Sequence, residues 1–91
     1  MPNVHVDTFA VYTNNTISGA FRGFGILQAA FAHESQMDML AEKVGITPWE
    51  MRFRNALKHG LSTATGQVFN EGVGFEDTLL AAKRYMTETP L

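Results

Sequence analysis

The sequence predicts an α+β fold in which helices dominate. An N-terminal segment is rich in β-branched and aromatic residues, three later segments repeat their apolar residues at helical spacing, and a capping signature marks residue 47. We therefore expect an N-terminal strand, possibly paired with a short second strand, packed against about three helices. A chain of 91 residues is short of the usual domain size of about 100–150 residues, so we expect residues 1–91 to form a single domain.

The predicted strand runs from Val4 to Thr13. Its even-numbered residues fall on one face by period two, and Phe9 and Val11 add apolar groups to the other face. The members of the even face are Val4, Val6, Thr8, Ala10 and Tyr12. This pattern predicts a strand whose second half is buried on both sides, ending in the turn 13–16. Any second strand would be the short segment 67–69, inside a Ser/Thr/Gly-rich loop that spans residues 61–74.

The first helix is predicted from about Ile26 to Val44, with Gly45 as its left-handed terminal residue. The second begins at the capping box of Thr47 and Glu50 and continues to Gly60. The third runs from about Phe75 to Met86, with acidic residues in its first turn and basic residues in its last, and residues 87–91 form a frayed tail.

Composition excludes several classes of protein. Without cysteine there is no disulfide, no Fe–S ligation by thiolates and no thiol nucleophile. Seven Lys and Arg against nine Asp and Glu give no electrostatic basis for binding nucleic acid. No apolar run approaches the roughly 18 residues of a membrane span, and the start resembles no secretory signal. We expect a cytoplasmic protein, and a charged fraction of 18% suggests faces that more protein covers.

The candidate site is the glycine-rich bend, residues Ser18–Gly25, between the predicted strand and the first helix. Its glycines allow unusual backbone angles, and it leads into a helix N-terminus that favours an anion. Arg22 adds a donor fork suited to phosphate or oxo groups, and Phe21 and Phe24 offer faces for a flat partner. The glycine spacing fits neither the dinucleotide fingerprint nor the P-loop. Core packing of both phenylalanines and a surface role for Arg22 stay open on this basis.

Other candidates are weaker. The three histidines lack partners at ligand spacing, so no metal site is predicted, and no serine lies in a hydrolase elbow. Glu34 and Asp38, four residues apart, could be paired carboxylates, but a solvated face or a partner contact explains them more simply.

The chain resembles the molybdenum-binding subunit of the xanthine dehydrogenase and aldehyde oxidase family. The most specific match is Gly19-Ala20-Phe21-Arg22-Gly23-Phe24-Gly25 with Gln28. Supporting matches are Pro2-Asn3-Val4, Val6-Asp7, 11–15, 34–38, Leu40-Ala41, Pro48, Glu50, Arg52, Asn55 and 65–67. Leu27 departs from the family pattern, which usually has proline there.

The resemblance implies a molybdenum hydroxylase acting on purines, N-heterocycles or aldehydes. It implies a molybdenum–molybdopterin cofactor, in some members as a cytosine dinucleotide, with Fe–S and FAD groups on other domains or subunits. Ala20, Phe21, Arg22 and Gly23 match cofactor-contacting positions, and Phe24 matches a position that stacks on the substrate. The chain carries no catalytic residue under this reading, because the family's glutamate motif is absent.

Two hypotheses follow. In the first, the chain is a fragment of a molybdopterin-binding domain, inactive alone, whose partners are the rest of the molybdenum subunit and the Fe–S and FAD parts. In the second, it is a freestanding helical module that binds a protein partner and retains the glycine-rich bend as core. Exposed Phe24 and Arg22 around a concavity would favour the first hypothesis, and their burial under the helices would favour the second.

Overall fold

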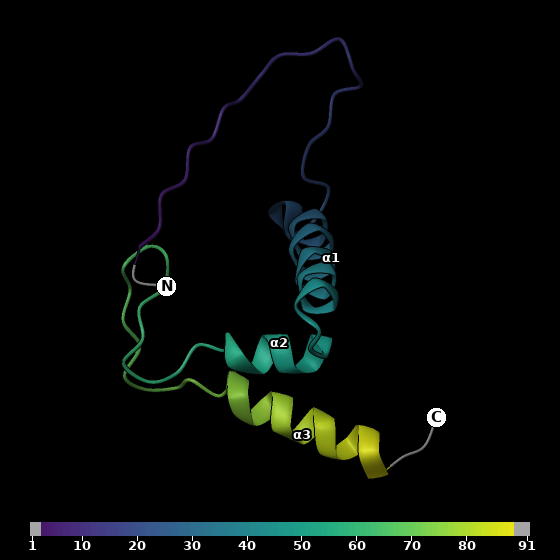
Figure 1. Cartoon of the computed structure of the whole chain (residues 1–91). Coiled ribbons are helices and arrows are strands. Elements are labelled where there is room, and N and C mark those ends of the chain that lie inside the picture. The colour runs from purple at the N-terminus through teal and green to yellow at the C-terminus, as the bar shows by residue number, and fades with distance from the viewer. Residues whose placement is uncertain (1–2, 89–91) are drawn as a thin grey trace.

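The computed structural model describes residues 3–88, which form an extended N-terminal arm and three helices. The N-terminal arm, residues 3–22, arcs away from the helices and returns to a single 3-10 turn, η1 (Gly23–Gly25). The helices α1 (Ile26–Val44), α2 (Pro48–Arg54) and α3 (Phe75–Glu88) follow, with α2 packed against both others (Figure 1).

The predicted strand Val4–Thr13 is wrong. Within residues 3–88 no strand forms, and the described part is helical rather than α+β. The physical reason is pairing: an extended segment becomes a strand only when a neighbour accepts its backbone hydrogen bonds, and even an isolated hairpin is only marginally stable. The N-terminal arm has the residue pattern of a strand, but the described residues offer it no such neighbour.

The second predicted strand is wrong as well, although its residues are ordered. Val68 forms an isolated antiparallel bridge with Ser62, inside the same loop. The backbone N–H of Thr63 donates to the Gln67 carbonyl over 2.9 Å, and the backbone N–H of Gly60 donates to the Phe69 carbonyl over 2.8 Å. Hydrogen bonds within the loop therefore use backbone groups that pairing with a distant strand would have required.

Helix α1 has the predicted bounds, and the left-handed Gly45 ends it as predicted. Gly45 adopts φ 81°, and its N–H donates to the carbonyls of Ala41 and Glu42. The N–H of Ile46 also donates to the carbonyl of Ala41, over 3.1 Å. The left-handed glycine thus satisfies terminal carbonyls and reverses the chain toward α2.

Helix α2 begins as predicted and ends earlier. The Thr47 hydroxyl accepts the N–H of Glu50 over 3.1 Å. The helix stops at Arg54, and Gly60 lies well beyond its end. Asn55 accounts for the difference, because its side-chain amide donates to the Met51 carbonyl over 2.8 Å, and such competition with the backbone favours termini over helix interiors.

Helix α3 starts at Phe75 as predicted and extends to Glu88 rather than ending at Met86. The tail predicted from residue 87 is therefore helical in its first two positions, and residues 89–91 lie outside the described part. The indole N–H of Trp49 donates to the Leu79 carbonyl over 2.9 Å, which ties α3 to α2.

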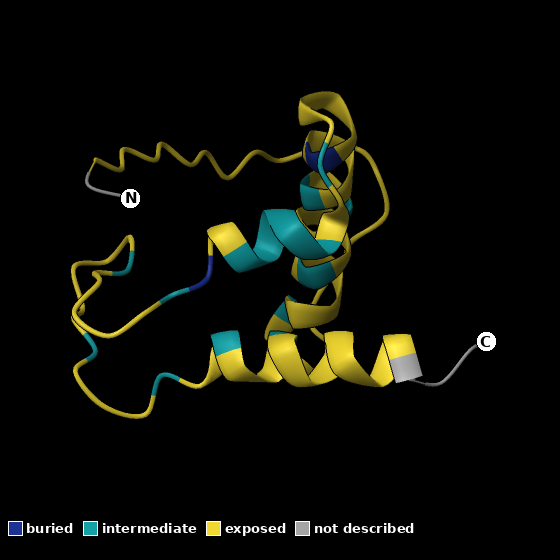
Figure 2. Cartoon of the chain, turned by 60° about the horizontal axis from the view of Figure 1, so that its bottom comes forward, coloured by how far each residue is buried: buried dark blue, intermediate teal, exposed yellow. Residues whose placement is uncertain are grey.

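The described residues bury very little. Only Ala41 and Ala56 are fully buried apolar residues (Figure 2). The Cα radius of gyration is 16.9 Å, whereas a compact domain of this length has about 12 Å. The α1–α2 pair carries most of the packing, and the N-terminal arm contributes almost none.

Candidate functional site

The glycine-rich bend has a left-handed backbone at its end. Gly23, Phe24 and Gly25 have φ values of 76°, 54° and 83°, so three consecutive residues lie in the left-handed region. Arg22 just before them is extended, with φ −158° and ψ 141°. The N–H of Ile26 donates to the Gly23 carbonyl and closes the turn. The chain therefore changes direction within a few residues and enters α1.

The two glycines are needed for different reasons. A Cβ at Gly23 would lie 3.0 Å from Cγ2 of Ile26, so position 23 is crowded as well as left-handed. A Cβ at Gly25 would meet only the Gln28 side-chain oxygen, at 3.9 Å, so position 25 is restricted by its φ alone. Phe24 lies between them as the one described non-glycine residue with positive φ.

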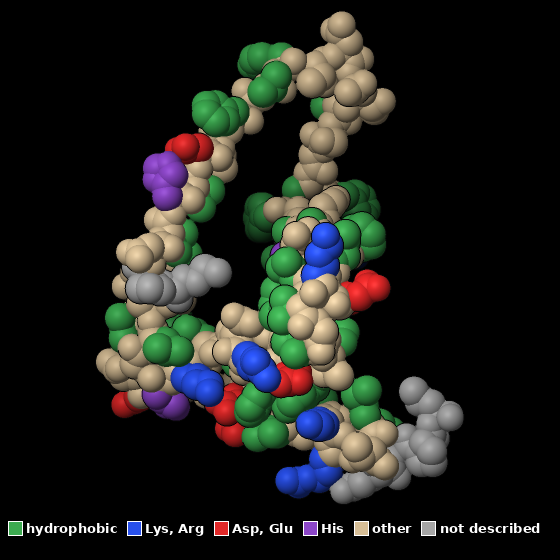
Figure 3. Space-filling model, in the orientation of Figure 1, with side chains coloured by type: hydrophobic (Ala, Val, Ile, Leu, Met, Phe, Trp, Pro, Cys, Tyr) green, Lys and Arg blue, Asp and Glu red, His purple; other side chains and the backbone are tan. Residues whose placement is uncertain are grey.

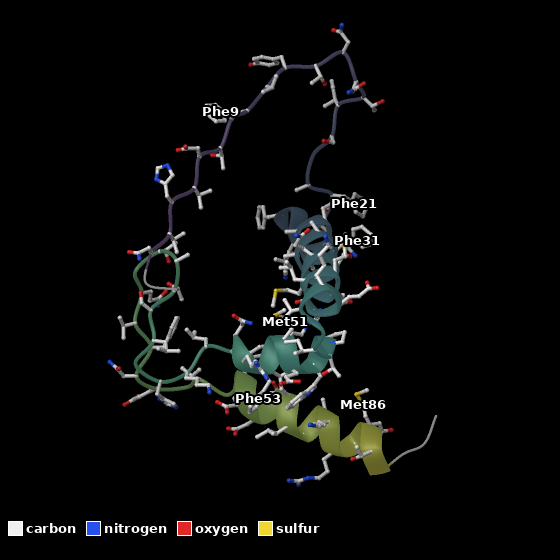
Figure 4. The ribbon with its side chains drawn as sticks, viewed as in Figure 1. Phe9, Phe21, Phe31, Met51, Phe53 and Met86 are labelled. Carbon is white, nitrogen blue, oxygen red and sulfur yellow. The ribbon has the colours of Figure 1, made fainter. Side chains whose placement is uncertain are left out.

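The side chains of the glycine-rich bend point into solvent. Phe24 is 100% exposed and Phe21 is 94% exposed. The Arg22 guanidinium carbon lies 5.7 Å from the centroid of the Phe21 ring, a cation–π arrangement. Figure 4 labels Phe21, which precedes α1, and Phe31, which lies in the first half of that helix. Core packing of the phenylalanines beneath the helix pair is thus wrong for this structure.

All five predicted contact residues, Ala20 to Phe24, lie together on this exposed turn. They form one surface rather than the open concavity that the first hypothesis expected. A groove of about 850 Å³ lies elsewhere, between α2 and α3. The glycine-rich bend is thus suited to be one wall of a pocket whose other walls the described residues do not supply.

The electrostatics of this region favour an anion. The N-cap residue of α1 is Gly25, which has no side chain to accept the free N–H groups of the first turn. Arg22 is the only Lys, Arg, Asp or Glu between Asp7 and Glu34. Helix N-termini and guanidinium groups both stabilise negative oxygens.

The sequence reasoning missed a cluster that fixes the scaffold, which we call the Arg52 clamp: Arg52, Glu34 and Asp38. Arg52 of α2 donates from Nε to Glu34 over 2.7 Å and from a terminal nitrogen to Asp38 over 2.8 Å. It also donates to the backbone carbonyls of Glu34 and Pro48. Its hydrogen bonds to Asp38 and Glu34 raise the pKa of Arg52.

The Arg52 clamp explains the paired carboxylates of α1. Both carboxylates are bound by one guanidinium, and both remain more than half exposed, so they lie on a solvated face and also join α1 to α2. Their spacing of four residues, followed by an arginine on the next helix after a short connection, was a signal that could have revealed the ion pair.

Among residues 3–88, no group of three or more His, Asp or Glu side chains is placed to hold a metal ion. In the same part of the chain, no helix is both long enough and apolar enough to span a membrane.

Comparison with known proteins identifies the family of this chain. Residues 1–56 match the family described as molybdopterin cofactor-binding domain, and the chain belongs to that family. The match includes the N-terminal arm, the glycine-rich bend, α1 and α2, and it ends before α3.

The relatives are oxidoreductases. The chain is 49% identical over 88 residues to the nicotinate dehydrogenase large molybdopterin subunit of Eubacterium barkeri, covering 97% of this chain and 21% of that protein. It is 46% identical over 67 residues to an aldehyde oxidoreductase of Megalodesulfovibrio gigas, covering 74% of this chain and 7% of that protein. It is 38% identical over 69 residues to human aldehyde oxidase, covering 76% of this chain and 5% of that protein. The chain thus spans about a fifth or less of the length of these relatives.

The glycine-rich bend fits a molybdopterin group on chemical grounds. Molybdopterin is flat and carries anionic oxygens, and this turn presents exposed aromatic rings, a guanidinium and an uncapped helix N-terminus. At Gly19 no atom lies within 4 Å of the position that a Cβ would take, so the backbone there is open to close approach.

Proposed function

We propose that this chain supplies one wall of the molybdopterin site of a larger oxidoreductase. In this proposal Ala20, Phe21, Arg22 and Gly23 contact the cofactor, and Phe24 lies against the substrate. The observation that carries the proposal is the left-handed turn at residues 23–25, which exposes Phe24 fully and brings Arg22 beside the uncapped start of α1.

Arg22 supports this proposal through the cost of burying a charge. It is the only Lys, Arg, Asp or Glu in a long, largely apolar stretch, and the rest of a large subunit would cover much of that stretch. A covered guanidinium needs an anionic partner, because an uncompensated buried charge costs several kcal/mol, on the order of 3–5. Anionic oxygens of a bound cofactor meet that need.

Phe24 supports an orienting role toward the substrate. An exposed ring held by a restricted backbone presents a fixed face, and aromatic faces stack on flat unsaturated molecules. When bound, the cofactor supplies the redox chemistry, and the protein residues named here bind and orient. The family's substrates suggest hydroxylation of a purine, an N-heterocycle or an aldehyde.

The remaining parts of the enzyme follow from the same proposal. Residues 1–91 are one part of a molybdopterin-binding domain, and the chain alone is inactive. Fe–S and FAD groups on other domains or subunits carry the electrons away, and the cofactor is molybdopterin either in its plain form or as the cytosine dinucleotide. The cytoplasmic location stays a prediction from the sequence.

A chimera tests the proposal. The segment of the Eubacterium barkeri subunit that aligns with this chain is replaced by the chain, and bound pterin is measured by fluorescence after oxidative release. We expect the chimera to retain cofactor and turnover, Arg22→Ala to lose at least about tenfold in cofactor content, and Phe24→Ala to lose turnover while retaining cofactor. A tenfold loss corresponds to about 1.4 kcal/mol, within the range of one charge-assisted hydrogen bond.

The control is Lys43→Ala, since Lys43 lies in the last turn of α1, far along the helix from the glycine-rich bend. Full cofactor content in the Arg22→Ala chimera would contradict the cofactor role. Turnover by the 91-residue chain alone, with an electron acceptor and xanthine or an aldehyde, would contradict its inactivity.

A further inference from the structure

The groove between α2 and α3 is a second candidate site, separate from the glycine-rich bend. Its volume of about 850 Å³ lies within the range of about 300–1,000 Å³ typical of ligand pockets. Its lining includes Trp49, Phe53 and Arg54 from α2, and Lys83 and Met86 from α3. Figure 4 shows Phe53 and Met86 on these two helices.

The aromatic part of this groove is preorganised. Trp49 and Phe53 stack with ring centroids 4.8 Å apart and planes inclined by 15°. The hydrogen bond from the Trp49 indole to the Leu79 carbonyl fixes the indole ring across the helix junction. Each ring has one face against the other, and the ammonium groups of Lys83 and Lys58 lie over the remaining faces of Trp49 and Phe53. Neither residue is fully buried, so the edges of the stack keep surface for a further apolar group.

The charge of the groove is carried by Lys83. Its ammonium lies 4.1 Å from the Trp49 ring centroid. Among the side chains that the structure describes, it forms no ion pair and no hydrogen bond. The other lining cation, Arg54, is paired with Glu50 one helical turn away. One positive charge with spare donors thus stands beside an aromatic surface.

We propose that this groove binds a small planar aromatic carboxylate. The ring would lie against the edge of the Trp49–Phe53 stack and the Met86 side chain, and the carboxylate would accept from the Lys83 ammonium, which already lies over the Trp49 ring. The charge of the lining argues against the other ligand classes. A cationic ligand would meet Lys83, and a polyphosphate would need several free cations where the groove offers one.

This site is separate in space from the proposed cofactor wall. The α2 side of the groove lies within residues 1–56, which match the molybdopterin-binding family, and the α3 side, with Lys83, lies outside them. The groove is also at the far end of α1, because α2 follows the C-terminus of that helix and the glycine-rich bend precedes its N-terminus.

The single tryptophan of the chain provides the readout. Trp49 gives the only indole N–H signal in a ¹H–¹⁵N spectrum of the labelled 91-residue protein. The probe is 2-naphthoate, and the matched neutral probe is 2-naphthylmethanol. We expect 2-naphthoate to shift the indole signal saturably and to bind up to about fivefold more tightly than 2-naphthylmethanol, a difference expected of one exposed charge pair.

Variants of Lys83 complete the experiment. Lys83→Gln should weaken 2-naphthoate binding by up to about fivefold, Lys83→Arg should preserve most of it, and Lys43→Gln should leave it unchanged. Circular dichroism checks that each variant retains its helices. Equal affinity for the two probes, unchanged affinity in Lys83→Gln, or no saturation by about 10 mM probe would each overturn the proposal. None of these results bears on cofactor content, so the cofactor wall is tested separately.

Discussion

At the scale of single residues, the conformation of Phe24 is the least expected feature of the chain. A non-glycine residue in the left-handed region costs roughly 1–2 kcal/mol, and strained residues of this kind cluster at ligand-binding sites. The flanking left-handed glycines make the turn possible but leave Phe24 to bear that cost. Since Phe24 is also fully exposed, no packing within the described residues offsets it.

Much of this site could be predicted from the sequence, because glycines, an arginine and aromatic rings before a helix start are local signals. The left-handed φ of Phe24 could not, since glycine spacing permits positive φ at glycines and says nothing of the residue between them. The residues that would complete a pocket at Arg22 also could not be predicted, because walls supplied by distant parts of a longer chain leave no local pattern.

Glycine substitutions test the turn. We expect Gly23→Ala to weaken the first turn of α1 by roughly 1–2 kcal/mol, because a left-handed alanine is strained and its Cβ crowds Ile26. Gly19→Ala is the matched control, since it has neither positive φ nor any atom within 4 Å of the added Cβ. Amide hydrogen exchange at residues 26–30 measures the difference. Equal protection in the two variants would show that the turn is not restricted as described.

At the scale of elements, the helices were predictable and the strands were not. Thr47, Pro48 and Gly45 act through hydrogen bonds within a few residues, so their signals survive in a chain of any length. A strand at Val4–Thr13 depends on neighbours far away in sequence, and its residue pattern cannot say whether they are present. The sequence predicts that α2 ends at Gly60, because glycine is a typical helix terminator. The helix ends before Asn55 instead, because the Asn55 side chain binds the backbone carbonyl of Met51.

The Arg52 clamp is the strongest polar link between α1 and α2. We expect Arg52→Ala to lower the free energy of unfolding by about 1–2 kcal/mol, more than one exposed ion pair, because the side chain is largely covered and binds two carboxylates and two carbonyls. Arg52→Lys should recover only part, since an ammonium cannot reproduce the fork geometry. Urea unfolding followed by circular dichroism measures both.

The pH dependence of the Arg52 clamp follows from the raised pKa of Arg52. A cation whose pKa is higher in the folded state adds stability that is complete below its unfolded pKa and is lost only as pH rises through the folded value. For arginine that window lies above ordinary working pH, so the difference between wild type and Arg52→Ala should stay constant from about pH 7 to about pH 10. Arg54→Ala, which breaks a pair on a single helix, serves as control and should cost less than about 0.5 kcal/mol.

At the scale of the whole molecule, the chain exposes far more surface than a compact protein of its mass. Its accessible area is 8555 Å², whereas a folded monomer of 10.1 kDa has about 5,300 Å². Figure 3 shows hydrophobic side chains along the N-terminal arm and over α1, with most visible charged side chains around α2 and α3. The excess area is therefore rich in apolar groups, as expected of a surface that more protein covers.

That surface should make the isolated chain self-associate. Leu27 and Phe31 are 70% and 78% exposed on the half of α1 that precedes Glu34, where α1 has no Lys, Arg, Asp or Glu. A helix that is apolar on most sides is normally buried, and each exposed apolar side chain gains roughly 1.5–3 kcal/mol on full burial. Light scattering after size exclusion should give a mass above 10.1 kDa that rises with concentration in the micromolar range.

The double variant Leu27→Glu with Phe31→Glu tests whether this apolar surface of α1 causes the self-association. Both positions precede Glu34 on α1, and neither belongs to the Arg52 clamp. We therefore expect the helix pair to survive, while association requires a concentration about tenfold or more higher. Replacing Lys43 by Glu adds negative charge at the exposed end of the same helix and should change association little. A strictly monomeric wild type up to about 1 mM would contradict the self-association expected of this exposed apolar surface.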